Sequence, residues 1–184
     1  MSRGKTILKK ERFQLTIDRL CHELIENYGD FENTAIIGIQ ERGALLSDRV
    51  LNRLEKITKK KDFEYGKLDI TFYRDDFRTS GKILKAANTE IDFFLEHKNI
   101  ILIDDVLYTG RTVQAALAAL QDFGRPAKVE LLSLVDRRFN RDLPIQADYQ
   151  GITIDAVGEA YVKVEWEHID GEDKVVLLSK KRTN

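Results

Sequence analysis

The stretch ILIDDVLYTGRT, residues 101–112, combines residue types that suit one kind of chemistry. Two adjacent carboxylates, Asp104 and Asp105, follow an apolar run of strand length, and a Thr-Gly-Arg-Thr turn precedes a helical pattern. A loop between a strand and a helix exposes free backbone N–H groups, and the helix dipole adds partial positive charge. The turn therefore predicts a phosphate-binding loop, in which a glycine lets the backbone approach the anion closely. Its donors and charge would come from Thr109, Gly110, Arg111 and Thr112.

The two carboxylates narrow the ligand that this loop would bind. Carboxylates accept hydrogen bonds from neighbouring hydroxyls, and charge-assisted hydrogen bonds are the stronger kind. Asp104 and Asp105 beside a phosphate loop therefore fit a ribose 5-phosphate, and their charge would favour an oxocarbenium-like transition state. An acidic pair alone is usually just solvated, so the complete run carries the prediction. The chain has neither a Walker A sequence nor a G-x-G-x-x-G fingerprint.

Strands that alternate with helices must position this loop. Continuous apolar runs predict buried strands at 34–39, 99–103 and 128–136, and alternation predicts further strands at 67–73, 151–155, 161–166 and 174–179. Helical spacing predicts helices over 11–28, 43–57 and 112–124, the last one ended by Gly124. The pattern predicts an α/β fold, a Rossmann-like parallel sheet flanked by helices, with the three continuous runs at its centre.

Ligands of an open parallel sheet bind at the carboxyl ends of its strands. Besides residues 104–112, two other strand ends carry suggestive residues, QERG at 40–43 and VDRR at 135–138. The polar stretch 74–90 has weak periodicity and is expected to be a loop. No Ser/His/Asp or Cys/His set is evident, so a side-chain nucleophile is not expected.

Composition limits the other possibilities. The chain has 184 residues, a length that favours one domain, and 30 basic against 31 acidic residues, which argues against a dedicated nucleic-acid binder. It contains no apolar run long enough for a membrane span and no secretory signal, so a cytoplasmic location is expected. Cys21, the only cysteine, lies on the core face of the first helix and is expected to be a buried thiol.

ILIDDVLYTGRTVQAAL resembles the binding motif for phosphoribosyl diphosphate (PRPP) of the type I phosphoribosyltransferases. Further segments resemble the pyrimidine-operon attenuation regulators, the PyrR family, which also act as uracil phosphoribosyltransferases. These segments are LDITFYRDDF, FGRPAKVELLSLVDRR, RDLPIQADYQG and IDGEDKVVLL, and the similarity extends from about Leu20 to Leu178. The resemblance implies one phosphoribosyltransferase domain over 1–184, with a flexible loop at about 74–90 and a small hood built from the N-terminal segment and about 137–170.

The resemblance also implies roles for individual residues. Asp104 and Asp105 would hold the ribose hydroxyls of PRPP and, with the pyrophosphate, a Mg²⁺ ion. Arg74, which begins the flexible loop with Asp75, would act with them in catalysis. Arg42 and Gly43 match the pyrophosphate loop, which often contains a non-proline cis peptide. The 5-phosphate would be bound by the backbone of Leu107 and Tyr108 together with Thr109, Gly110, Arg111 and Thr112, and the base by Val135, Asp136 and Arg137.

The implied reaction is displacement of pyrophosphate from PRPP by a uracil nitrogen, which gives UMP and serves pyrimidine salvage. Closure of the loop would exclude water from the reacting atoms. A homo-oligomer, a dimer or a tetramer, is also implied. Two alternatives stay open: an RNA-binding attenuation regulator that senses UMP, and a related transferase that acts on a purine base or orotate.

Two departures from the family pattern bear on these alternatives. DRRFNRDLPIQADY stands where the family shows DRGHRELPIRADY, and a lysine-containing segment that follows in the family is absent. Between 155 and 173 the chain has one lysine, Lys163, against seven acids: Asp155, Glu159, Glu165, Glu167, Asp170, Glu172 and Asp173. Because RNA affinity depends on Lys and Arg, RNA attenuation is predicted to be weak or absent. Glu41 also places an acid in the pyrophosphate loop.

Overall fold

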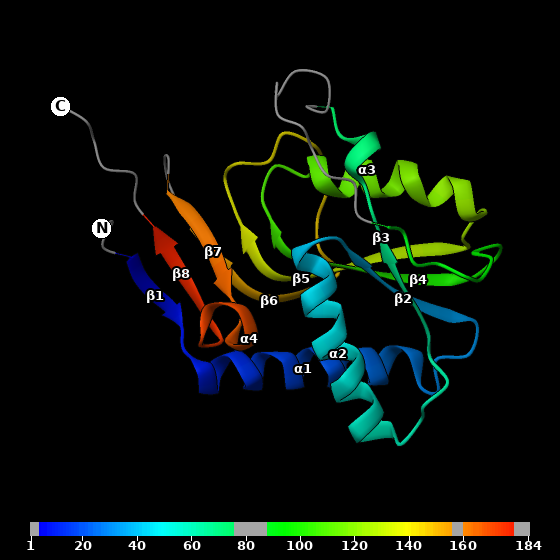
Figure 1. Ribbon diagram of the computed structural model, residues 1–184, viewed down its shortest axis with the longest axis horizontal. Helices are drawn as coiled ribbons and strands as arrows, with labels where there is room; N and C mark the ends of the chain where they lie inside the picture. The colour runs from blue at the N-terminus through cyan, green and yellow to red at the C-terminus, as the bar shows by residue number, and fades with distance from the viewer. Residues whose placement is uncertain (1–3, 76–87, 156–159, 179–184) are drawn as a thin grey trace.

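A parallel sheet of five strands forms the centre of the protein, in the order β3-β2-β4-β5-β6 (Figure 1). The computed structural model describes residues 4–75, 88–155 and 160–178. The strands of this sheet are β2 (Thr34–Ile39), β3 (Glu64–Leu68), β4 (Asn99–Leu107), β5 (Lys128–Arg137) and β6 (Tyr149–Ile154). The predicted α/β class is confirmed, and the three continuous apolar runs are the three central strands.

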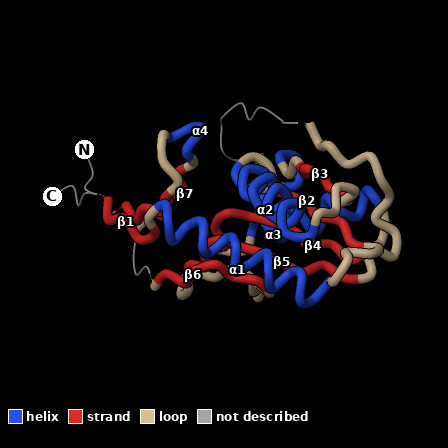
Figure 2. The backbone as a smooth tube through the Cα atoms, turned by 90° about the horizontal axis from the view of Figure 1, so that it is seen from below, coloured by secondary structure: helices blue, strands red, loops and turns tan. Residues whose placement is uncertain are grey.

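Helices cover both faces of this sheet, which explains why its central strands contain continuous apolar runs. The helices α1 (Lys10–Tyr28) and α2 (Arg42–Thr58) lie on one face. On the other face lies α3 (Arg111–Leu120), which continues into a 3₁₀ turn, η2 (Gln121–Phe123). Figure 2 shows α1 running along the sheet.

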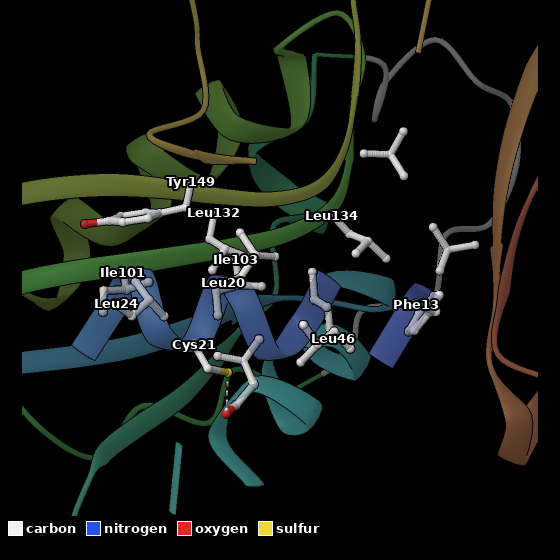
Figure 3. Packing of buried hydrophobic residues seen from close by; sticks show 14 of the residues in the cluster. Phe13, Leu20, Cys21, Leu24, Leu46, Ile101, Ile103, Leu132, Leu134 and Tyr149 are labelled. Carbon is white, nitrogen blue, oxygen red and sulfur yellow. Dashed lines mark hydrogen bonds between the residues drawn. The ribbon is translucent and has the colours of Figure 1, made fainter. Parts of the chain in front are cut away.

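Side chains alternate between two hydrophobic clusters along each central strand, as the period of a strand requires. In β4, Ile101 and Ile103 pack toward α1 and α2, whereas Ile100 and Leu102 pack toward α3. Figure 3 shows the first cluster, where Leu20 and Leu24 of α1 meet the strands. Cys21 is buried there, as predicted, and its thiol lies 3.7 Å from the carbonyl oxygen of Val50.

A second, antiparallel sheet of three strands lies beside the start of α1, at the left of Figure 1. Its order is β1-β8-β7, with β1 (Gly4–Leu8), β7 (Tyr161–Glu165) and β8 (Lys174–Leu178), and the short helix α4 (Glu167–Asp170) joins β7 to β8. The strand β1 and helix α4 were not predicted. Part of the stretch expected in the hood, β6, instead forms an edge of the parallel sheet.

Three predicted boundaries were wrong. The strand expected at 67–73 ends at Leu68, because the Asp69 carboxylate accepts hydrogen bonds from the N–H and hydroxyl of Thr71 and starts the 3₁₀ turn η1 (Thr71–Tyr73). The strand expected at 99–103 continues to Leu107, so the two carboxylates lie inside it. The helix expected to reach Gly124 is α-helical only to Leu120.

Of the loop expected at 74–90, residues 76–87 lie outside the described part of the chain. Within the described ranges, no helix is both long and apolar enough to cross a membrane.

Candidate active site

Asp104 and Asp105 lie near the carboxyl end of β4, with 7% and 8% of their surfaces exposed. Strand alternation points their side chains to opposite faces of the sheet. Asp104 lies on the same side of β4 as Ile100 and Leu102, which face α3. Its Oδ1 accepts a hydrogen bond of 3.0 Å from the Asp105 N–H. Asp105 lies on the same side of β4 as Ile101 and Ile103, which face α1 and α2, and the positive charge of Arg42 acts to lower its pKa.

Burial without full compensation raises the pKa of both carboxyl groups. For Asp104 the pKa lies well above its ordinary value, first because of burial and second because of the Asp105 charge, while Arg74 acts in the opposite direction. Burial raises the pKa of Asp105 to about 6, against the opposing effects of Arg42 and the Val106 N–H. Among the described residues, the positive charges of Arg42 and Arg74 therefore do not offset the effect of burial on the pKa values of this pair.

A cavity of about 530 Å³ opens at this end of the sheet. Its lining brings together Asp104, Arg74 and the loop that leads into α3; the lining residues are Arg74, Asp75, Asp104 and Val106 to Val113. The structure thus gathers most of the residues predicted for ribose and phosphate binding around one space. Asp105 is not among the described residues that line it.

Residues 107–112, here called the phosphate cradle, end β4 and begin α3. Gly110 is the residue before the helix and has φ +93°, a left-handed conformation that an L side chain adopts only with strain. Ile145 and Leu143 would also lie 3.3–3.4 Å from a Cβ at this position. This conformation and the narrow space both favour glycine at position 110, where the start of α3 meets the cavity.

Arg111 is held by two carboxylates. Its guanidinium pairs with Asp75, and its Nε donates to Asp142 at 3.0 Å. The start of the 74–90 loop is thereby connected to the start of α3. An anion bound in the cradle would meet Arg111 only in competition with these carboxylates.

The predicted pyrophosphate loop approaches β4 from the end of β2. The peptide between Gln40 and Glu41 is cis, as the resemblance implied. A Cβ at Gly43 would lie 2.5 Å from the carbonyl oxygen of Ile103, so only glycine allows this approach. The guanidinium of Arg42 donates to the carbonyl oxygen of Val164 in β7 at 2.8 Å, which ties the loop to the small sheet.

The three residues predicted at the base differ in their surroundings. Val135 is buried in the cluster below α1 and α2, and its carbonyl oxygen accepts a hydrogen bond from Ser133. Asp136 is 6% exposed, and Arg141 donates to its Oδ1 at 2.5 Å. Arg137 is 3% exposed, and its Cζ lies 3.9 Å from the ring centroid of Tyr108. Its Nε and Nη2 have no hydrogen-bond partner among the described residues.

Two further residues hold the site together and were not predicted. The Leu107 N–H donates to the buried Ser133 hydroxyl at 3.1 Å, which fixes the end of β4 against β5. Arg141 contacts both Asp136 and the Tyr108 carbonyl oxygen. Arg141 is the third arginine in five residues, so the sequence offered no means of separating it from Arg137 and Arg138.

The parallel sheet has two buried acids and the loop 107–112 at its carboxyl edge, which is the arrangement expected of a phosphoribosyltransferase domain. The family model described as "Phosphoribosyl transferase domain" matches residues 4–170. The proteins named "Bifunctional protein PyrR" of Elusimicrobium minutum and Haemophilus ducreyi are 46% and 42% identical to this chain. These alignments cover 96% and 95% of the chain and 97% and 96% of the relatives. The chain belongs to the PyrR family of phosphoribosyltransferases.

Solved structures show the same fold at low sequence identity. A hypoxanthine phosphoribosyltransferase from Staphylococcus aureus matches with a TM-score of 0.68 and 18% identity, covering 98% of this chain and 94% of that one. At this identity the likeness supports the fold and carries no information about the base.

Proposed function

We propose that this chain transfers ribose 5-phosphate from PRPP to uracil, giving UMP and pyrophosphate. The observation that carries the proposal is the cavity that joins Asp104 and Arg74 to the phosphate cradle at the start of α3. Membership of the phosphoribosyltransferase family supports the same reaction.

In this reaction a ring nitrogen of the base bonds to the anomeric carbon of the ribose as the bond from that carbon to the pyrophosphate oxygen breaks. Pyrophosphate leaves with the electron pair, and the nitrogen loses its proton. The cradle would hold the 5-phosphate, Asp104 and Asp105 would accept hydrogen bonds from the ribose hydroxyls, and Arg42 and Arg74 would face the pyrophosphate. Ionised carboxylates near the anomeric carbon would stabilise its positive charge in the transition state.

Asp104, which lines the cavity, fits a Mg²⁺ ion that enters with the substrate, and Asp105 would join it only if its side chain turned toward the cavity. Mg²⁺ is usually bound by one or two carboxylates together with substrate phosphates, rather than by a cage of protein ligands. The described residues contain no cluster of three or more His, Cys, Asp or Glu that could hold a metal alone. Burial raises the pKa of both carboxyl groups, and a bound cation would favour their ionised forms. When bound, Mg²⁺ would neutralise charge on the leaving pyrophosphate.

Arg137 supports a base with carbonyl groups on its edge. A buried guanidinium with unpartnered N–H groups is costly, unless a ligand supplies acceptors. The carbonyl oxygens of uracil would do so, beside the Tyr108 ring on which Arg137 already stacks. Orotate and oxopurines also carry acceptors, so the base must be determined by experiment.

Steady-state kinetics with PRPP, Mg²⁺ and a panel of uracil, cytosine, hypoxanthine, guanine and orotate tests this proposal. We expect turnover with uracil and a KM for uracil raised about tenfold or more in Arg137→Met, since a buried charged hydrogen bond contributes roughly 1.5–3 kcal/mol. Arg138→Met is the matched control, because Arg138 is exposed and pairs with Asp155. Absence of turnover with every base, while PRPP still binds, would contradict the proposal, and turnover with only a purine or orotate would replace uracil.

The relatives are named "Bifunctional protein PyrR", and the second activity that the family resemblance implies is RNA binding. The acidic run that argued against it is largely neutralised, because each of its described acids has a basic partner. The pairs are Asp155–Arg138, Glu165–Lys163, Glu167–Lys10, Asp170–Lys163, Glu172–Lys174 and Asp173–Arg49. Charge repulsion is therefore weaker than the sequence suggested, but a balanced surface still offers little affinity for phosphates.

We expect weak RNA binding, with an affinity no tighter than the micromolar range typical of non-specific contacts, roughly 10⁻⁴–10⁻⁶ M. A gel-shift with pyrimidine-operon leader RNA, with and without UMP, measures it, and a scrambled RNA of equal length is the control. Nanomolar binding that depends on the leader sequence would overturn this prediction.

A further inference from the structure

The segment Arg141–Leu143 lies against the outside of the phosphate cradle. The Arg141 guanidinium donates to the carbonyl oxygen of Tyr108. The N–H groups of Asp142 and Leu143 both donate to the carbonyl oxygen of Thr109, at 3.0 and 3.2 Å. Two consecutive carbonyl groups of the cradle are therefore held by one short segment.

This contact has a consequence for the N–H groups of the cradle. A trans peptide is planar, and its C=O and N–H point in opposite directions. Holding the carbonyl groups of Tyr108 and Thr109 on the outside therefore turns the N–H groups of Thr109 and Gly110 toward the other side. Thr109 and Gly110 line the cavity, where N–H groups are needed to bind an anion.

Arg141 has a second anchor at the end of β5. Its Nη2 donates to Asp136 at 2.5 Å, and both side chains are largely buried. Asp136 precedes Arg137, whose guanidinium stacks on the ring of Tyr108. Arg141 thus connects the residues proposed to face the base with the peptide groups proposed to bind the phosphate.

We propose that Arg141 is a positioning residue that couples the base end of the site to the phosphate cradle. It acts through the Asp136 carboxylate and the Tyr108 carbonyl, and it does not touch the substrate. The inference rests on the proposed function, because it assumes that the cradle binds the 5-phosphate of a nucleotide. If Arg141 has this role, replacing it should weaken the binding of a nucleotide more than the binding of the corresponding nucleoside, which lacks the phosphate.

The contribution of the phosphate is measured as the ratio of the affinities for UMP and uridine, two ligands that differ only in the phosphate. Isothermal titration of wild-type, Arg141→Gln and Arg141→Lys with both ligands gives the ratio, and Arg138→Gln is the matched control, because Arg138 is a nearby exposed arginine that pairs with Asp155. We expect the ratio to fall by about tenfold in both Arg141 variants, within the range of 5–150-fold that is common for coupled sites. It should stay unchanged in Arg138→Gln.

The variants separate positioning from other roles. Lysine keeps the positive charge but cannot place two N–H groups on two separate acceptors as a guanidinium does, so full recovery in Arg141→Lys would assign the effect to charge and overturn the inference. A purely structural role would lower the melting temperature and weaken both ligands equally, leaving the ratio unchanged.

Failure of the proposed function has a different signature. A wild-type chain that turns over no base and binds UMP no better than uridine would overturn the proposed function, and this inference with it. A wild-type chain that strongly prefers UMP, with the same preference in Arg141→Gln, would overturn this inference alone.

Discussion

Replacing Gly43 with alanine is expected to destabilise the protein by about 3 kcal/mol or more and to remove most of its transferase activity. A Cβ at this position would lie 2.5 Å from the carbonyl oxygen of Ile103, 3.0 Å from the Cα of Asp104 and 3.2 Å from its Oδ1. Two of these atoms belong to the backbone of the central strand β4, which pairs with a neighbour on each side and cannot move easily. The start of α2 must move instead, and with it Arg42.

Chemical denaturation and steady-state kinetics measure the two effects. Gly171→Ala is the matched control: Gly171 ends α4 in the left-handed α conformation with φ +88°, but nothing lies within 4 Å of a Cβ there. Its cost should be only the roughly 1–2 kcal/mol of a left-handed alanine, with activity retained. A Gly43→Ala protein with wild-type stability and kinetics would show that the contact between α2 and β4 is not tight.

Replacing Asp105 with asparagine is expected to stabilise the ligand-free protein at neutral pH while lowering kcat by at least about 100-fold, as loss of a transition-state interaction does. Burial raises the pKa of Asp105 from 3.8 to about 6. Between these values the folded state binds more protons than the unfolded state, so the free energy of unfolding falls as pH rises. The destabilisation caused by the ionised Asp105 is therefore complete above about pH 6. Asparagine carries no charge and does not cause it.

We therefore expect Asp105→Asn to raise the free energy of unfolding by about 1–3 kcal/mol at pH 7.5 and by much less at pH 4.5. Urea denaturation at both pH values measures this difference. Asp155→Asn is the control with the opposite sign, because Arg138 lowers the pKa of the exposed Asp155 and its carboxylate is stabilising at neutral pH. An equal gain at both pH values would contradict the explanation by burial of charge.

These two predictions describe the same trade-off. The buried acidic pair lowers the stability of the ligand-free protein, and the close contact of Gly43 with β4 leaves no room for a larger residue. Together they place negative charge where the ribose of PRPP is proposed to bind. Sites that bind charged ligands often carry such a cost, which the ligand and its metal remove on binding.

Local sequence patterns determined the central part of this fold. The continuous apolar runs of β2, β4 and β5 could be predicted as central strands, because a strand segment buried on both faces is apolar at successive positions instead of at alternate ones. The cradle could also be predicted, since Gly110 and the acids before it lie within a few residues of one another. Short spacing lets a sequence specify a loop whose conformation depends mainly on its own residues.

Only the tertiary structure decided which distant groups meet. Three contacts join residues that are distant in the sequence. The Arg141 guanidinium donates to the Tyr108 carbonyl, the Leu107 N–H donates to the Ser133 hydroxyl, and Gly43 lies against Ile103. The acids between 155 and 173 counted as free charges in the sequence, although those that the structure describes have basic partners, which include Lys10 of α1 and Arg49 of α2. The physical reason is that periodicity records which face of an element is buried, whereas the partner on that face is set by how the elements pack.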